Sequence, residues 1–289
     1  MAVTVACIVS ERIFHPWDAG RIEGRRIAPR PTPFGPSADV FLIDAPGPAF
    51  YLAPRYGSTA SGPGDRGARP RATLYVLKDL GVQHVLEWAP AGAVTHTVAI
   101  GDLVLPTDLI DRTSLRPRTF FEGSPVGAIR QFPVFCPTLR QAAGQVLHEM
   151  KLVYHGAGTV AVTEGPRLET PAEIRQLAHA GVELVSHAFV PEVFLAKELQ
   201  LCYAGLAYVV SYAETGRQQR PFALGNLFGG LTQQTDAERL AAAVGALNEI
   251  VRNITDALGR IERTCQCAAA LADHVRQYNL SEDWHEWFA

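Results

Sequence analysis

The stretch from Thr163 to Glu198 constrains the fold more strongly than any other part of the sequence. Its residues read in order as a turn, a helix, a short strand, a second turn and a second helix. Gly165 and Pro166 predict the first turn, because these residues interrupt regular structure. A strand enclosed between two helices is typical of an α/β fold, in which helices cover the faces of a sheet.

The first helix of this stretch carries signals at both of its ends. Thr170 suits the N-cap, Pro171 the first turn, and Glu173 the reciprocal position of a capping box. Gly181 is expected to stop the helix. One face of the helix is apolar and consists of Ala172, Ile174, Leu177 and Ala178.

The next strand, Val182–Val185, is short and apolar, as expected for a buried strand. It runs into Ser186, His187 and Ala188, and a second helix begins near Pro191. Proteins of the α/β class bind ligands where a strand ends and faces the following helix. We therefore expect a ligand site around His187.

Composition and charge narrow the class of protein. The chain has 289 residues, and 47% of them are hydrophobic, which is enough for one sizeable core. The formal net charge of −3 gives no electrostatic reason to expect nucleic acid or an acidic membrane as a partner. Five cysteines are an odd and sparse set, which suggests a reducing compartment. Because the sequence has no apolar stretch of about 18 residues and no basic segment before its apolar start, we expect a cytoplasmic protein without a transmembrane helix or signal peptide.

Further elements follow from the spacing of apolar and turn residues. Strands are expected at Val3–Val9, Val82–Trp88 and Tyr203–Val210, a hairpin at Asp39–Asp44 and Ala49–Leu52, and helices at Ala72–Leu80 and over residues 236–277. Residues 15–37 are rich in Arg, Gly and Pro and are predicted to form a loop. The aromatic tail from Trp284 to Phe288 is expected to pack on a neighbouring subunit. The sequence has no internal repeat, so residues 1–289 are expected to form a single domain.

The sequence resembles the purine nucleoside phosphorylase and methylthioadenosine phosphorylase family. The family motif E/A-G-P-x-F/L-E-T/S matches Glu164–Thr170, and V-P-E-V-x-x-A-K/R matches Val190–Lys197. A third motif, G-D-I/L-V-I/L, matches Gly101–Leu105, and the resemblance extends from about Ala38 to Cys267. It implies an α/β fold of three layers, with a central mixed sheet flanked by helices, and a homotrimer or hexamer.

Members of this family move a ribosyl group from a purine to phosphate through a transition state that resembles an oxocarbenium ion. The resemblance therefore implies three parts for the site. An anion or a water must lie below C1′, the leaving purine must be hydrogen-bonded, and the sugar must be aligned. It also implies a small-molecule nucleoside as ligand and no cofactor, with phosphate as the co-substrate.

The resemblance places the purine site at several positions. Glu169, next to Leu168, matches the glutamate with which 6-oxopurine enzymes accept the N1 proton; the alternative is a glutamate favoured at a helix N-terminus by the macrodipole. Ser211 stands where the family hydrogen-bonds purine N7, and its hydroxyl can donate one hydrogen bond. Gly92 keeps a family glycine, and Ala213 stands where adenine-selective members have Asp.

His187 replaces the methionine that packs under the ribose in the family. Its ring is polar and titrates near neutral pH, so it suits a ribose hydroxyl, an acidic group or a catalytic water. The alternative is a histidine that is satisfied within the core, as histidines at strand ends often are. We take His187 and Ser211 as the candidate catalytic residues.

The phosphate site departs most from the family pattern. Arg55 matches the phosphate-binding arginine. The turn after the first strand has lost every glycine of the family turn, and Arg12 stands near its hydroxyl residue. Ala89 and Ala188 stand where the family has hydroxyl side chains. The candidate anion-binding positions are Arg55, Arg12 and Ala188, and Ala89 is a candidate substrate contact.

Cys265 and Cys267 form a C-x-C pair that is predicted to lie inside or at the end of the long C-terminal helix. A structural zinc site needs a second pair of ligands, so we predict no metal site. The pair resembles the terminal C-x-C of some methylthioadenosine phosphorylases. The alternative is two unpaired thiols.

Three functions fit the sequence. The first is a phosphorylase that cleaves the N-glycosidic bond of a purine nucleoside or a 5′-methylthio-nucleoside, and Glu169 favours a 6-oxopurine. The second is an enzyme on the same scaffold that uses water, with His187 as base, and does not need phosphate. The third is a non-catalytic relative that binds a ligand. The family resemblance favours the first.

Overall fold

A computed structural model describes residues 4–10, 24–44, 46–56, 69–215, 225, 229–232 and 236–288 of the chain. Arg12 lies outside these residues, as does most of the turn after the first strand. The structure therefore describes the anion-binding side of the predicted site only in part.

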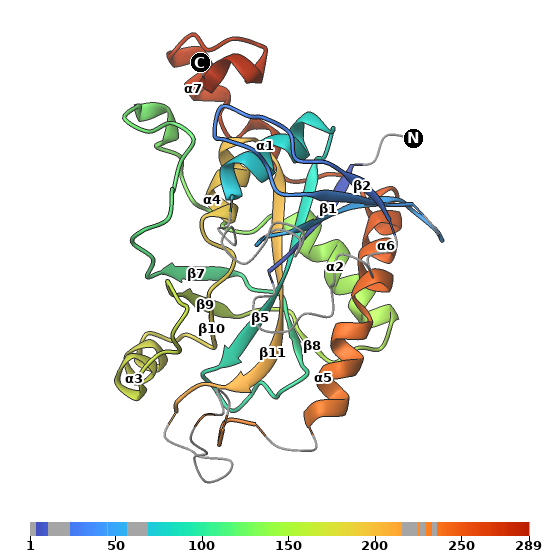
Figure 1. The fold of residues 1–289 in the computed structure, drawn as a ribbon, viewed down its shortest axis with the longest axis vertical. Coiled ribbons are helices and arrows are strands. Elements are labelled where there is room, and N and C mark those ends of the chain that lie inside the picture. The colour runs from blue at the N-terminus through green and yellow to red at the C-terminus, as the bar shows by residue number, and fades with distance from the viewer. Residues whose placement is uncertain are drawn as a thin grey trace.

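One mixed sheet forms the centre of the described fold (Figure 1), and it has 11 strands. Its main path runs through β2 (Arg25–Ile27), β3 (Val40–Ile43), β4 (Phe50–Pro54), β1 (Val5–Val9), β5 (His84–Ala93), β10 (Leu184–Ser186), β9 (Thr159–Val162) and β7 (Asp108–Asp111). A branch leaves β5 through β11 (Cys202–Tyr212), β6 (Leu103–Val104) and β8 (Tyr154–His155). The predicted α/β fold with a central mixed sheet is thus confirmed.

The strands β5 and β11 form the middle of this sheet and run parallel to each other. Nearly every residue of β11 is buried, because both faces of the strand are covered. Tyr203 and Ala207 point into the core on one face, whereas Leu206 and Tyr208 point into the core on the other. This alternation follows from the two-residue period of a strand, and it explains why the apolar run is continuous.

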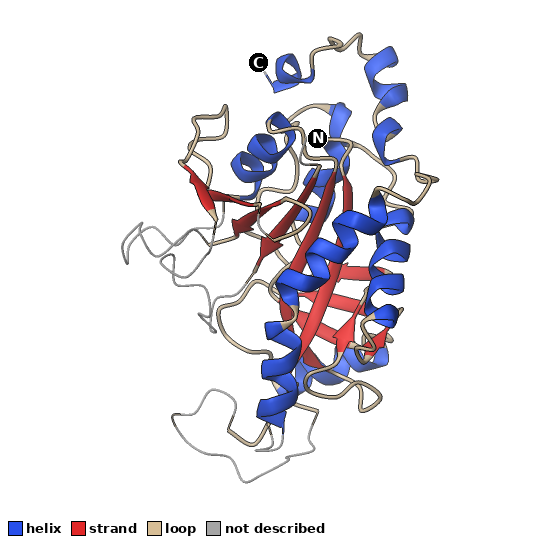
Figure 2. Cartoon of the chain, turned by 90° about the vertical axis from the view of Figure 1, so that its right-hand side faces the viewer, coloured by secondary structure: helices blue, strands red, loops and turns tan. Residues whose placement is uncertain are grey.

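Helices cover both faces of the sheet. The helices α1 (Pro70–Asp79) and α4 (Glu192–Glu198) pack together on one face, and α2 (Pro137–Glu149), α5 (Asp236–Gly245) and α6 (Leu247–Leu258) lie on the other. Figure 2 looks onto the side of α2, α5 and α6 and shows them crossing the strands. The remaining elements are α3 (Pro171–His179), α7 (Ala272–Gln277) and the short 3-10 helices η2 (Pro125–Gly127), η3 (Cys267–Ala269) and η4 (Trp284–Phe288). Within the described ranges, no helix is both long enough and apolar enough to cross a membrane.

The helix α3 begins and ends as the sequence predicts. The Thr170 side chain accepts a hydrogen bond from the backbone N–H of Glu173, and the Glu173 carboxylate accepts one from the backbone N–H of Thr170. Gly181 adopts a φ of 77°, in the left-handed region that favours glycine, just after the helix ends. The reciprocal cap fixes the start of α3 directly beside Glu169.

Two local predictions are wrong. The strand β2 lies inside the predicted loop 15–37; its residues are largely exposed, and it is held by backbone pairing to β3 rather than by an apolar pattern. The helical region predicted over 236–277 is divided into α5, α6 and α7, and the C-x-C pair lies between α6 and α7. The tail packs on its own chain, where Phe288 contacts Phe34 and Phe120 with ring centroids 5.5 and 5.1 Å apart; its contact with a neighbouring subunit stays a prediction.

Candidate active site

A cavity that is partly open to solvent lies where β5, β10 and β11 end. Its wall is mostly apolar and includes Val185, Val210 and Leu231. Seven of the predicted site residues line it, namely Gly92, Leu168, Glu169, His187, Ala188, Ser211 and Ala213. The fold therefore brings the predicted purine and sugar positions together in one cavity.

Glu169 and Glu214 both line this cavity, and Glu169 is only 8% exposed. Thr163 Oγ1 donates a hydrogen bond to Glu169 Oε1 over 2.5 Å, and His187 Nε2 lies 3.3 Å from the same oxygen. Burial alone would raise the pKa of Glu169, but the hydrogen bonds from His187 and Thr163 outweigh it and hold the pKa below its usual value. The Glu169 side chain is therefore ionised at neutral pH and can accept a hydrogen bond from a ligand.

His187 lies at the end of β10, between Glu169 and the turn at Gly165. A Cβ atom on Gly165 would lie 2.8 Å from Nδ1 of His187, and Gly165 has a φ of 67°. Only glycine allows both this backbone conformation and this close approach of the ring. The side chain of His187 remains 25% exposed, so its ring faces the cavity as well as Glu169.

Ser211 reaches the cavity because of an irregularity in β11. The pairing of β11 with β5 shifts between Val209 and Ser211, so that Val209 lies opposite Ala91 and Ser211 opposite Gly92. Such a bulge changes the direction of the side chains that follow it. A Cβ on Gly92 would lie 3.7 Å from Ser211 Oγ, which shows that the glycine leaves this part of the cavity open.

Arg55, the predicted phosphate ligand, is buried and fully engaged within the protein. Its Nε and Nη2 donate to the Glu192 carboxylate over 2.6 and 2.9 Å, and Nη2 also donates to the Val190 carbonyl. Its Nη1 donates to the His187 carbonyl and to the Tyr56 hydroxyl. A guanidinium has five N–H groups, and these contacts use all of them. Burial alone would lower the pKa of Arg55, but Glu192 and other neighbours raise it above its ordinary value.

Of the other predicted anion and substrate positions, Ala188 lies at the cavity and Ala89 does not. Ala188 lines the cavity, and its N–H donates to Ser186 Oγ over 3.2 Å. Ala89 is fully buried in β5 and packs in the core, not at the wall of the cavity. Arg55 borders a second cavity, which shares Tyr56 with the first.

Glu87 is a polar residue near the cavity that the sequence analysis missed. It is fully buried in β5 and accepts hydrogen bonds from Ser10 Oγ over 2.5 Å, from the Phe189 N–H over 3.1 Å and from the Tyr203 hydroxyl. Burial and the nearby Glu192 raise its pKa to about 7, against the lowering effects of Arg55 and of the hydrogen bonds. The signal in the sequence was an acidic residue inside an otherwise apolar strand, since a buried charge needs partners.

Arg116 is a second missed residue, and it holds the loops around the cavity together. Its Nη2 donates to the carbonyls of Thr163 and Glu164, and its Nη1 donates to the carbonyls of His187 and Val190. Its Nε donates to the Glu164 carboxylate over 3.0 Å. Arg116 therefore joins the turn before α3 to the loop after β10, which carry Glu169 and His187.

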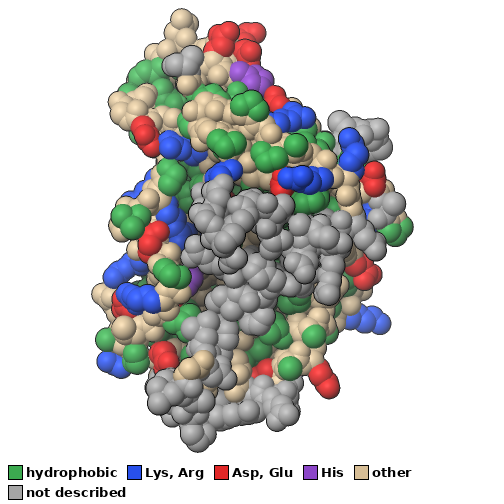
Figure 3. Space-filling model, viewed as in Figure 1, with side chains coloured by type: hydrophobic (Ala, Val, Ile, Leu, Met, Phe, Trp, Pro, Cys, Tyr) green, Lys and Arg blue, Asp and Glu red, His purple; other side chains and the backbone are tan. Residues whose placement is uncertain are grey.

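Basic side chains gather along the left edge of the face in Figure 3, at the level of β7 in Figure 1. Several arginines near this edge of the sheet are already paired. Arg118 contacts Asp111, and Arg167 contacts Glu173. The two charges in each pair neutralise each other, so these arginines provide little net attraction for a polyanion.

The fold and the cavity together define an α/β protein with a small-molecule site at the strand ends of one mixed sheet. The family described as the phosphorylase superfamily matches residues 59–252 of the 289. This chain therefore belongs to the phosphorylase superfamily.

Named relatives support this assignment. The chain is 30% identical over 242 residues to an S-methyl-5′-thioadenosine phosphorylase of Thermofilum pendens, which covers 83% of this chain and 87% of the relative. It is 35% identical over 211 residues to a probable 6-oxopurine nucleoside phosphorylase of Moorella thermoacetica, covering 72% of this chain and 79% of the relative. In fold it resembles a mutant adenosine/methylthioadenosine phosphorylase of Schistosoma mansoni in complex with adenine, with a TM-score of 0.75, 23% identity and 93% and 96% of the two chains covered.

Proposed function

We propose that this chain is a nucleoside phosphorylase that acts on 6-oxopurine nucleosides. The observation that carries the proposal is Glu169, a buried carboxylate held ionised at the wall of a mostly apolar cavity. A 6-oxopurine offers an N1–H to such an acceptor, whereas the N1 of adenine has no hydrogen to donate. A buried acceptor left without a donor is costly, so the carboxylate selects between the two bases.

In the proposed reaction, an oxygen of phosphate bonds to C1′ of the sugar as the bond from C1′ to purine N9 breaks. The electron pair of that bond passes to the purine, which takes up a proton, and the products are the free base and ribose 1-phosphate. Ser211 donates a hydrogen bond to N7 while negative charge develops on the leaving purine. His187, hydrogen-bonded to Glu169, is close enough to the cavity to position a sugar hydroxyl.

The acceptor in this proposal is phosphate, and membership of the superfamily supports it. We place the phosphate near Ser10, Tyr56 and Ala188, which border one part of the cavity. Arg55 acts there through its contacts with the carbonyls of His187 and Val190, which shape the loop after β10. No cofactor takes part in this reaction.

The test is the release of purine from inosine, guanosine, adenosine and methylthioadenosine, each with and without phosphate. We expect release from inosine and guanosine only when phosphate is present, with kcat/KM at least about tenfold above that for adenosine. Equal release in the absence of phosphate would point to hydrolysis. A preference for adenosine or methylthioadenosine would show that Glu169 does not accept a hydrogen bond from N1.

We also propose that the protein is a cytoplasmic homotrimer or a hexamer built from trimers. Two apolar side chains support an assembly: Leu115 is 84% exposed and Phe132 is 77% exposed, and both lie in the long connection between β7 and α2. Exposed apolar side chains of this size often mark contacts between proteins. Light scattering on the purified protein gives the mass of the assembly, and a monomer at micromolar concentration contradicts the proposal.

A further inference from the structure

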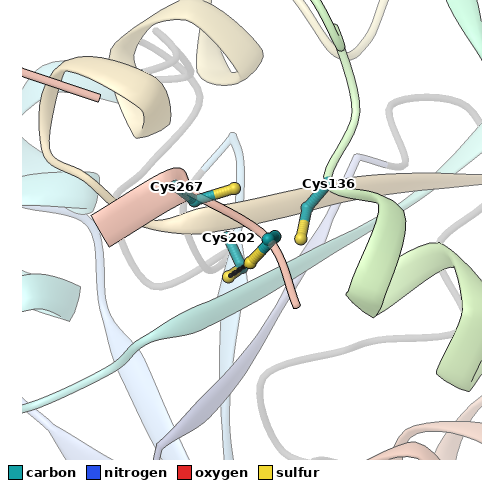
Figure 4. A group of neighbouring side chains, drawn as sticks. Cys136, Cys202 and Cys267 are labelled. Atoms are coloured by element: carbon teal, nitrogen blue, oxygen red, sulfur yellow. Dashed lines mark hydrogen bonds between the residues drawn. The ribbon is translucent and has the colours of Figure 1, made fainter. Parts of the chain in front are cut away.

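Four cysteine thiols meet at one point of the fold, away from the cavity (Figure 4). Cys136 is the N-cap of α2, Cys202 begins β11, and Cys265 and Cys267 lie in the segment that follows α6. The four Sγ atoms all lie within 4.8 Å of one another. The C-x-C pair alone gave no reason to expect a metal, but the fold adds the second pair that such a site requires.

We propose that these four thiolates bind one Zn²⁺ ion in a tetrahedral structural site. A zinc–sulfur distance of about 2.3 Å in a tetrahedron separates the sulfur atoms by about 3.8 Å. The Sγ atoms of Cys202 and Cys265 lie 3.4 Å apart, and the whole group is compact enough to surround one ion. The proposal concerns a site that the phosphorylase reaction does not use.

Backbone N–H groups already hold three of the four ligands in position. The N–H of Cys136 donates to the Tyr203 carbonyl over 2.7 Å, and the N–H of Cys202 donates to the Gln83 carbonyl over 2.9 Å. The N–H of Cys265 donates to Thr138 Oγ1 over 3.2 Å, which ties the C-terminal segment to the first turn of α2. These contacts set the positions of the three ligands before any metal binds.

The surroundings suit the charge of such a site. Four thiolates and one Zn²⁺ carry a net charge of −2, which requires nearby cations or N–H donors in a partly buried position. Arg263 Nε donates to Cys265 Sγ over 3.5 Å. A positive side chain therefore contacts the cluster directly.

The proposed role is structural. Four protein ligands close the coordination sphere and leave no open position for substrate or water, as in structural zinc sites. None of the four cysteines lines the cavity described above. The ion would join the segment after α6 to α2 and β11, and so fasten the C-terminal part of the chain to the sheet.

The first experiment measures the metal content and free thiols of the intact protein, purified under reducing conditions and then desalted. We expect one zinc per chain by mass spectrometry of the metal, and five free thiols per chain in denaturant after chelation. Disulfides in place of the metal, which would leave one free thiol, overturn the proposal. Five thiols with no zinc retained after incubation with excess ZnCl₂ also overturn it, and so does iron at one per chain.

A second experiment replaces zinc by Co²⁺, whose visible absorption reports tetrahedral thiolate coordination. We expect the tetrathiolate spectrum in the wild type and in Cys7→Ser, the matched control, because Cys7 lies in β1 outside the cluster. The double variant Cys265→Ser/Cys267→Ser should lose the spectrum and retain less than a tenth of the zinc. Metal content that stays unchanged in this variant contradicts the proposed ligands, and the wild-type measurements decide the question if the variant does not fold.

Discussion

At the scale of single residues, two glutamates near the cavity differ in charge because their partners differ. Glu169 accepts hydrogen bonds from Thr163 and His187, and these outweigh the effect of burial on its pKa. Glu87 is more deeply buried and faces the carboxylate of Glu192, so its pKa rises to about 7 in spite of Arg55. The same residue type therefore provides a fixed anion in one place and a titrating group in the other.

The variant Glu169→Gln tests the fixed anion. The side-chain amide has nearly the same shape but lacks the charge, and a hydrogen bond to a charged group contributes about 1.5–3 kcal/mol. We expect kcat/KM for inosine to fall about 10- to 100-fold, while the value for adenosine changes little. Initial rates at several substrate concentrations give both values.

Glu238→Gln is the matched control for this experiment, since Glu238 is exposed in α5 and lies outside the cavity wall. It should retain the wild-type kcat/KM for both nucleosides. An equal loss for inosine and adenosine in Glu169→Gln would mean that Glu169 supports the structure of the site rather than recognising the base.

The raised pKa of Glu87 predicts that the stability of the protein depends on pH. This pKa rises from 4.5 to about 7 on folding, so the folded state binds the proton more tightly than the unfolded state. The contribution of Glu87 to the free energy of unfolding is therefore fully present below about pH 4.5 and is lost as the pH rises to about 7. This loss is absent in Glu87→Gln. When the pH is raised from about 4 to about 8, the free energy of unfolding of the variant should therefore increase relative to that of the wild type by up to about 3 kcal/mol.

Urea unfolding of both proteins at the two pH values measures this gain. Glu198→Gln serves as the comparison, because burial also raises the pKa of Glu198 to about 7 and the same sign applies at a second site. If the free-energy difference between Glu87→Gln and the wild type is independent of pH, Glu87 does not titrate in this range.

Gly92 predicts a steric limit on the ligand. A Cβ at this position would lie 3.3 Å from Val185 Cγ1 and 3.7 Å from Ser211 Oγ, in the part of the cavity where we propose that the base binds. We expect Gly92→Ala to raise KM for inosine several-fold with less than about 1 kcal/mol change in stability. Gly245→Ala is the control, since a Cβ there meets no atom within 4 Å; an unchanged KM in Gly92→Ala would place the base elsewhere.

At the scale of elements, the capping box of α3 fixes the position of Glu169, the carboxylate proposed to bind the base. Thr170 begins the helix directly after Glu169 and accepts the Glu173 N–H over 3.3 Å. Thr170→Ala should lower the free energy of unfolding by about 1 kcal/mol, whereas Thr170→Ser keeps the hydroxyl and should lose less than half of that. Urea unfolding measures both, and equal losses would show that the cap does not stabilise this helix.

Elements with local signals could be predicted from the sequence. The start of α3 depends on residues within three positions of one another, and the hairpin of β3 and β4 depends on a turn between two apolar runs. In both cases, the residues that interact lie close together in the sequence. By contrast, β2 has no apolar pattern, and it is held by backbone pairing to β3 and by the contact of Arg26 with Asp39.

Contacts between distant residues could not be predicted in this way. Arg55 pairs with Glu192 across 137 residues, so its charge is neutralised by a partner that the local motif does not reveal. The four cysteines likewise come from three separate parts of the chain. Seven of the positions that the family motifs predicted line the cavity, but the motifs did not show which side chains are engaged by other parts of the fold.

At the scale of the whole molecule, the candidate active site and the C-terminal segment lie at opposite ends of the sheet. In Figure 1 the arrowheads of β5 and β11 point to one end, where the cavity lies, and α7 lies at the other. The proposed metal site and the aromatic tail both attach the C-terminal segment at that far end. Changes to this segment should therefore affect stability without reaching the cavity.

Phe288 provides the test of this separation. Its ring packs on Phe34, Tyr75 and Phe120, with centroid distances of 5.5, 6.1 and 5.1 Å, and so joins the tail to three other segments. Its side chain is only partly buried, so we expect Phe288→Ala to lower the free energy of unfolding by about 1–3 kcal/mol, and Phe288→Leu to lower it by less than half as much. Because the cavity is distant, KM and kcat for inosine should stay within about twofold of the wild type in both variants. A loss of activity in Phe288→Ala at a temperature where the protein is fully folded would show that the tail is coupled to the site, through α1 and the α4 helix that packs on it.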